Sequence, residues 1–189
     1  KCRDLRKAYQ EFWEDRGISL SSPENKIIRP YDNSIKNVPN VTIKVPTAGG
    51  KTFIACNALR TIFDNMPEEL TKVVTWFVPS DTILKQTYQN LSNPNHPYRQ
   101  KIDSLFNSRV NVINKESALM GKGMSMNDLR ENLTILVLSV DSFATNTGND
   151  RKSYRENENL SEIIKQYYQS ISKVKGADEY SLMNLIYHL

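Results

Sequence analysis

The sequence has few of the residues that build disulfide frameworks or zinc sites, and it has no long hydrophobic run. Cys2 and Cys56 are the only cysteines, and they lie far apart in the chain, as do the two histidines, His96 and His188. Neither spacing suggests a disulfide framework or a metal site. No apolar stretch approaches the roughly 20 residues that a membrane-spanning helix needs. We therefore expect no membrane span and a reducing compartment, the cytoplasm.

Composition and charge leave several functions open. The chain has 189 residues, of which 39% are hydrophobic, enough to form a core, and no internal repeat or low-complexity tract is present. A net charge of +4 permits nucleic-acid binding without requiring it. The polar start at Lys1 resembles neither a secretory signal nor a natural initiator, so we expect a piece of a longer protein.

A glycine-containing loop, "VPTAGGKT" at residues 45–52, lies between two periodic segments. Residues 41–45 alternate β-branched and polar side chains, which predicts a strand leading into the loop. After Thr52, apolar residues recur at helical spacing until Pro67, and this predicts a helix leaving the loop. The order is therefore strand, glycine pair, lysine, hydroxyl and helix.

This order suits phosphate binding, because the unpaired amides and the dipole of a helix N-terminus both favour an anion. Gly49 and Gly50 allow close backbone approach, Lys51 can reach the β and γ phosphates, and Thr52 can place its hydroxyl on Mg²⁺. The strict phosphate-loop pattern would place its first glycine at Val45, where it is missing. The structural alternative is a tight turn whose lysine is merely solvated.

Further strands and helices alternate along the chain. Residues 72–78, 110–113 and 133–140 are apolar runs typical of buried strands, and residues 81–91 show helical periodicity. This alternation predicts an α/β fold, a doubly wound parallel sheet that binds its ligands at the carboxyl ends of the strands. The loops after Val45, Val78 and Val140 should then share one edge.

Residues 46–52, "PTAGGKT", resemble motif I of superfamily-two helicases and translocases, although Ala48 replaces the glycine most common there. The stretch "WFVPSDTILKQTYQNLSNPNHPYRQ" is similar to the segment after motif I in type III restriction endonuclease subunits, and a close DEAD/DEAH-type relative is the alternative. The similarity extends from Leu5 to Phe143. The resemblance implies a RecA-like first motor domain at residues 41–189, with residues 1–40 as a helical lead-in. It also implies ATP and Mg²⁺ as cofactors.

The resemblance assigns roles to particular residues. Lys51 is the expected catalytic residue, and Thr52 the expected metal contact. The expected nucleotide-binding residues are Thr47, Ala48, Gly49, Gly50, Lys51, Thr52 and, for adenine, Gln10. The expected nucleic-acid-binding residues are Pro79, Ser80, Asp81, Gln86, Ser139 and Ser142. The alternatives are a surface glutamine at Gln10 and ordinary helix and loop capping at the serines.

Asp141 raises a competing interpretation, because "ILVLSVD" has the shape of a Walker B strand. Motors of this class place a glutamate next, as general base, and Ser142 cannot accept that proton. The acidic pairs at residues 68–69 and 178–179 do not end apolar strands. We therefore expect the fold to be truncated before the Walker B strand, with an Asp-Glu pair beyond Leu189 and no ATP hydrolysis by this chain alone.

Residues 150–189 suggest no chemistry. The charged segment 150–158 is typical of a solvated loop, and helical periodicity follows from Leu160 to Ile171, before a last apolar run at residues 183–189. 

The expected function is the ATP-binding N-terminal part of an ATP-dependent DNA translocase or helicase, the restriction subunit of a type III restriction-modification system. Its expected partners are the DNA backbone, read without sequence preference, and a methyltransferase (modification) subunit. Two other classes stay open: a P-loop enzyme acting on a small molecule, such as a kinase, and a regulatory nucleotide-binding module without catalysis.

Overall fold

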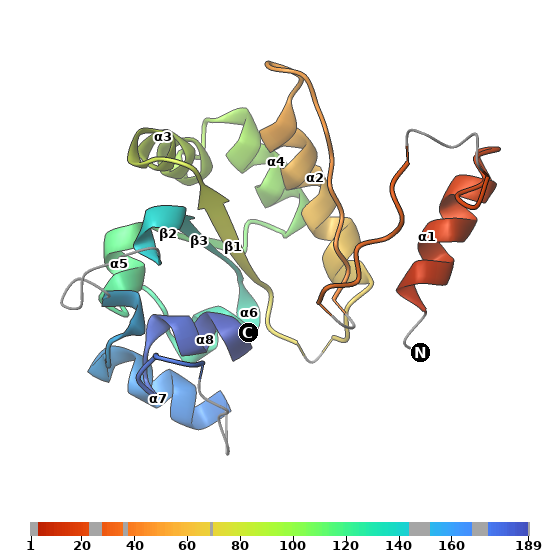
Figure 1. The fold of residues 1–189 in the computed structure, drawn as a ribbon. Helices are drawn as coiled ribbons and strands as arrows, with labels where there is room; N and C mark the ends of the chain where they lie inside the picture. The colour runs from red at the N-terminus through yellow and green to blue at the C-terminus, as the bar shows by residue number, and fades with distance from the viewer. Residues whose placement is uncertain are drawn as a thin grey trace. The chain divides into compact units, whose positions relative to one another are not determined.

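A computed structural model describes residues 4–22, 28–35, 38–68, 70–143, 152–167 and 174–188 of the chain (Figure 1). The chain divides into two compact units, Lys1–Gly49 and Gly50–Leu189, and each is described here by itself. The domain division after residue 40 that the sequence suggests stays a prediction.

The first unit contains helix α1 (Leu5–Glu14), and the Asp4 carboxylate caps it by accepting from the amides of Arg6 and Lys7. Aromatic side chains gather on this helix, where the rings of Tyr9 and Trp13 meet edge to face with centroids 6.2 Å apart. No residue of α1 is buried. The helix therefore depends on its cap and on ring contacts more than on a core.

The predicted strand at residues 41–45 is wrong for this structure. These residues have no strand pairing, and the side chains of Val41 and Ile43 are 76% and 60% exposed. Alternating apolar and polar side chains make a segment suitable for a half-buried position in a pleated sheet. A strand forms only where an adjacent strand pairs with its backbone N–H and C=O groups. The paired strands of the described residues all belong to the second unit.

The second unit is built on a parallel sheet of three strands, β1 (Val73–Val78), β2 (Val110–Ile113) and β3 (Leu133–Ser139), in the order β1-β3-β2. Val78 pairs with Ser139, and Ile113 pairs with Leu136. All of β3 is buried, as its uninterrupted apolar sequence predicts for a central strand. The three strand predictions at residues 72–78, 110–113 and 133–140 are confirmed.

Helices follow each strand and cover both faces of the sheet (Figure 1). The helix predicted at residues 81–91 is confirmed, and helices form both after the glycine loop and from Glu158. They are α2 (Lys51–Asp64), α3 (Asp81–Ser92), α4 (Pro97–Leu105), α5 (Lys115–Leu119), α6 (Met126–Glu131), α7 (Glu158–Tyr167) and α8 (Leu182–His188). Short 3₁₀ turns η1 (Val140–Ser142) and η2 (Lys152–Tyr154) lie between β3 and α7. Of the expected solvated loop at residues 150–158, residues 150 and 151 lie outside the described residues, η2 forms at Lys152–Tyr154 with Ser153 buried, and α7 begins at Glu158. Tyr168 and Ile171 also lie outside the described residues.

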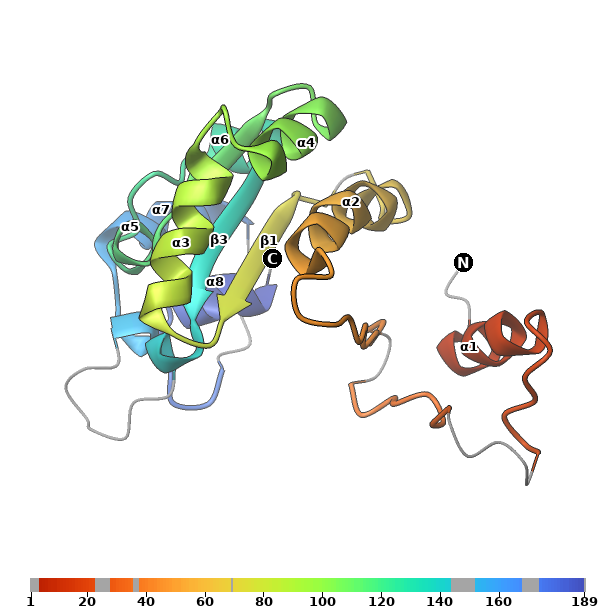
Figure 2. The same cartoon turned by 90° about the horizontal axis from the view of Figure 1, so that it is seen from above.

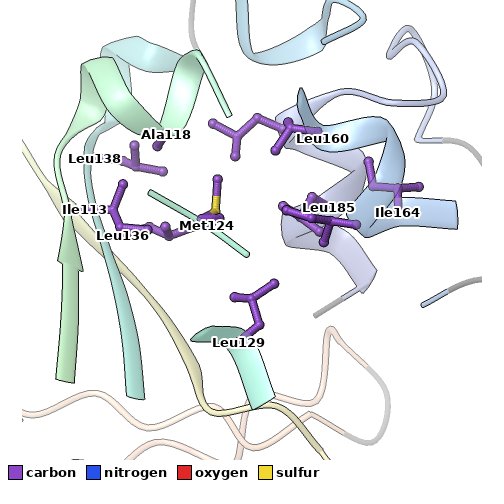
Figure 3. Close-up of a cluster of buried hydrophobic side chains, with 11 residues drawn as sticks. Ile113, Ala118, Met124, Leu129, Leu136, Leu138, Leu160, Ile164 and Leu185 are labelled. Carbon is purple, nitrogen blue, oxygen red and sulfur yellow. The ribbon is translucent and has the colours of Figure 1, made fainter. Parts of the chain in front are cut away.

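Alternate residues of β3 serve two separate cores. Leu133, Ile135 and Val137 pack in a cluster with side chains of α2, α3 and α4. Leu136 and Leu138 face the other way, into a cluster formed with α5, α6, α7 and α8 (Figure 3). Both faces are therefore covered, and the α/β doubly wound class predicted from the sequence is confirmed.

Cys56 lies in the first of these cores and has no exposed surface. Burial raises the pKa of its thiol from the ordinary 9.0 to about 11, because the thiolate loses its hydration. Since the thiolate is the reactive form, its population at neutral pH falls roughly 100-fold. We expect a Cys2→Ser chain to react with a disulfide reagent at least about 100-fold more slowly when native than in urea. Equal reaction rates for the native chain and the chain in urea, measured by absorbance, would contradict the buried position of Cys56.

Candidate phosphate loop and strand-end site

The loop before α2 is a tight turn with two left-handed residues. The amide of Gly49 donates to the carbonyl of Pro46 at 3.0 Å, and Ala48 has a φ of +61°. A Cβ at Gly49 would lie 2.5 Å from Cγ1 of Val45, so no larger residue fits there without rearrangement. Ala48 adopts the left-handed region at a cost of about 1 kcal/mol, which the usual glycine would avoid.

Gly50 begins α2 as a left-handed N-cap, with a φ of +78°. In the described part of the chain, helices α1, α3, α4, α5 and α6 each have a side chain that accepts from their first amides. Helix α2 has no side-chain cap, because its N-cap is a glycine. Its first turn thus lacks the N-cap side-chain acceptor that these five helices have, and an anion can take that place.

The remaining loop residues are open to solvent. Thr47, Ala48 and Lys51 are exposed, and Thr52 is half-buried in the first turn of α2. Thr47 to Gly49 belong to the first unit and Gly50 to Thr52 to the second, as one continuous stretch of chain. Gln10, on α1, is also exposed, and its amide donates to the carboxylate of Glu14 at 2.6 Å.

A second group of candidates lies at the carboxyl ends of the sheet, where β1 leads into α3 (Figure 2). Pro79 is exposed, and the half-buried Ser80 caps α3 by accepting from the amide of Ile83 at 3.4 Å. Asp81 is the first residue of α3 and is exposed, and Gln86 lies farther along the same helix, also exposed. These residues come from one continuous segment.

The structure brings the end of β3 to the same place through a lysine that the sequence reasoning missed. Nζ of Lys115 donates to Oδ1 of Asp81 at 3.2 Å and to Oγ of Ser139 at 3.3 Å. Lys115 opens α5, directly after the Asn114 cap that follows β2. Its place just beyond a predicted strand end was the available signal, but nothing in the local pattern shows which partners it reaches.

This contact determines the ionisation of Asp81. The hydrogen bond from Lys115 and then its charge lower the pKa of the Asp81 carboxyl below its ordinary value. Asp81 is therefore ionised at neutral pH and its charge is paired.

Ser139 has no exposed surface, so its hydroxyl faces Lys115 and not solvent. Val140 and Asp141 are exposed in η1. The side chain of Ser142 lies outside what the structure describes. The backbone after β3, and not the Ser139 hydroxyl, is the accessible part of this loop.

A cavity lies away from these strand-end loops. A cavity of about 450 Å³ is lined by Arg60, Phe63, Lys72 and Phe106, among others, near the beginning of β1. Parallel α/β sheets bind their ligands at the opposite, carboxyl end of the strands. The chemistry-bearing residues gather at that end, so the strand-end loops form the better candidate site.

Two searches of the described residues give negative findings. No group of three or more histidine, cysteine, aspartate or glutamate side chains in the described ranges could hold a metal ion. No helix within those ranges is long and apolar enough to cross a membrane.

A parallel sheet covered by helices on both faces, with a glycine turn before α2, agrees with a P-loop domain of the RecA-like class, and the family match shows that class. Residues 7–167 match the family model described as type III restriction enzyme, res subunit, and the chain belongs to this family. The family supplies the ATP-binding, helicase-like motor domain of these enzymes. No curated protein matches the chain, and no solved structure does.

Proposed function

We propose that the chain is the nucleotide-binding part of an ATP-dependent DNA translocase or helicase, the res subunit of a type III restriction system. The observation that carries this proposal is the glycine-turn start of α2. There, a helix without a side-chain cap begins with Lys51 and Thr52, within a chain that belongs to the res-subunit family. The proposed location is the cytoplasm, where such a motor meets DNA.

The donor set suits an ATP phosphate chain with Mg²⁺. Phosphate oxygens can approach the backbone amides around Gly49 and Gly50 closely, because neither residue has a Cβ. The ammonium of Lys51 neutralises the β and γ phosphates, and the Thr52 hydroxyl is a hard oxygen donor of the kind that Mg²⁺ prefers. Bound Mg²⁺ would supply charge neutralisation at the transferred phosphate. Gln10 is the proposed adenine contact, and it would have to release Glu14 to make it.

The proposed DNA contacts are the loops after β1 and β3. The proposed residues are Pro79, Ser80, Asp81 and Gln86 after β1 and Ser139 and Ser142 at the end of β3. The exposed backbone of these loops suits phosphates and carries no base readout. We propose a modification methyltransferase as the protein partner, since base-specific recognition has no candidate among these residues. DNA binding by this chain should therefore be weak and indifferent to sequence.

Hydrolysis needs an adjacent aspartate and glutamate, and the described residues place no such pair at a strand end. Asp141 follows β3 but is succeeded by Ser142, and Asp178 and Glu179 lie in a turn whose carbonyls accept from Asn184. Glu68 lies outside the strands, and Glu69 lies outside the described residues. We propose that this chain binds ATP without turning it over. Turnover by the purified chain that disappears in Asp141→Asn would instead make Asp141 the Walker B residue.

The test is DNA-stimulated ATP hydrolysis by the full-length parent. We expect double-stranded DNA to raise the turnover, and the Lys51→Ala parent to lose turnover in its presence and absence alike, because both depend on the same phosphate contact. A P-loop enzyme for a small molecule would hydrolyse or transfer phosphate without a response to DNA. A regulatory module would bind ATP without turnover under either condition, so each of these two results would contradict the proposal.

A further inference from the structure

Lys115 connects the ends of all three strands of the sheet. It follows β2, and its ammonium is within hydrogen-bond distance of Asp81, beyond β1, and of Ser139, the last residue of β3. The three residues are far apart in sequence, since Lys115 is 34 positions from Asp81 and 24 positions from Ser139. The contact is therefore a tertiary tie between separate loops.

The burial of the three side chains differs in a way that suggests a role. Lys115 is 22% exposed, Asp81 is 66% exposed, and Ser139 has no exposed surface. The lysine thus lies beneath the surface carboxylate, with its charge directed at the loop and not at solvent. A lysine in this position holds the first turn of α3 against the end of β3.

The charges around Asp81 support the same role for Lys115. Asp81 alone would repel a phosphate that approaches the amides of α3, since both are anionic. Lys115 pairs with this carboxylate, and Lys85 on the same helix adds a weaker attraction. The pair offsets this repulsion, and the contacts of Lys115 link the two segments that are the proposed DNA contacts.

We propose that Lys115 is a positioning residue for DNA binding: it ties the loop after β1 to the loop after β3, so that their amides meet successive phosphates in one fixed arrangement. This role rests on the proposed function, because it takes those loops as the DNA contacts. It differs from a direct contact, in which the lysine would itself neutralise a phosphate.

The first measurement tests the tie without DNA. Amide hydrogen exchange of Ser80 to Ile83 and of Val140 and Asp141 should speed up in Lys115→Met and stay close to wild type in Lys115→Arg, whose guanidinium can hold both partners. Lys122 is an exposed lysine after α5, and Lys122→Met serves as the control because it removes the same charge. Unchanged exchange in Lys115→Met would overturn the proposal.

The second measurement uses the 189-residue chain and a short DNA duplex. We expect Lys115→Met to weaken binding roughly tenfold, with little change in the dependence of affinity on salt, and Lys115→Arg to restore it. In an Asp81→Asn background the effect of Lys115→Met should shrink, since the pair is already broken. A direct phosphate contact would instead lower the salt slope by about 0.9, and that result would overturn the positioning role.

The outcomes also separate this inference from the proposed function. Faster exchange with unaltered DNA affinity would show that Lys115 ties the loops but does not position DNA, and it would overturn the inference alone. Faster exchange together with no DNA binding by the wild-type chain at low salt would overturn the proposed DNA contacts, and the positioning role with them.

Discussion

Replacing Lys51 with alanine is expected to abolish binding of ATP and ADP by the chain while leaving its fold unchanged. Hydrogen bonds from a charged group to phosphate are worth about 1.5–3 kcal/mol each, so losing the ammonium should weaken binding roughly 100-fold or more. Lys51 is exposed, and no core contact is lost with it. Titration calorimetry with Mg²⁺ and each nucleotide measures the loss, and far-ultraviolet circular dichroism checks the fold.

Lys44→Ala provides the matched control, because Lys44 is an exposed lysine just before the turn and its substitution removes the same charge. It should bind nucleotide nearly as the wild type does, since long-range effects of one surface charge are screened at physiological salt. Thr52→Ala should lower affinity in the presence of Mg²⁺ and have little effect in its absence. Equal nucleotide binding by wild type and Lys51→Ala would refute the phosphate loop.

The glycine turn and the start of α2 could be predicted from the sequence because their geometry is local. A turn that demands Gly49 by steric contact, a left-handed Gly50 and a helix start at Lys51 all follow from adjacent residues. The central strand β3 could be predicted for a similar reason, since it is apolar on both faces and so reads as buried whatever its neighbours are.

The predicted strand at residues 41–45 failed because strand formation is not local. Alternation at Val41 and Ile43 describes how a strand would bury one face, but hydrogen bonds to a neighbour form the strand, and a sequence does not say which neighbour is available. The polar tie from Lys115 to Asp81 and Ser139 was missed for the same reason. That α3, α5 and the end of β3 bring these three residues together can be seen only after the order β1-β3-β2 is known.

Ser139 shows how burial changes a predicted role. The resemblance to superfamily-two motors implied that this residue contacts a nucleic-acid strand, and small hydroxyls suit phosphates. In the structure it is the last buried position of β3, paired with Val78, and its hydroxyl accepts from Lys115. Whether the loop binds DNA stays a proposal, but the atoms that could do so are those after Ser139.

Truncating Leu136 to alanine is expected to destabilise the second unit by about 2–5 kcal/mol. Leu136 is fully buried in the central strand and pairs with β1 and β2 on either side, so neither backbone can shift to fill the space without disturbing both ladders. The substitution leaves a cavity in the cluster that joins the sheet to α5, α6, α7 and α8 (Figure 3). Urea unfolding followed by circular dichroism and tryptophan fluorescence measures the change in the free energy of unfolding.

Leu70→Ala makes the same chemical change at an exposed position and should alter that free energy by no more than about 0.5 kcal/mol. Ile135→Val, on the opposite face of β3, should cost only about 0.5–1.5 kcal/mol, because it removes one methylene from the other core. If Leu136→Ala cost no more than Leu70→Ala, β3 could not be the shared central strand of two cores. The strand-end arrangement of Ser139 would then lose its support, because the position of Ser139 depends on the same strand.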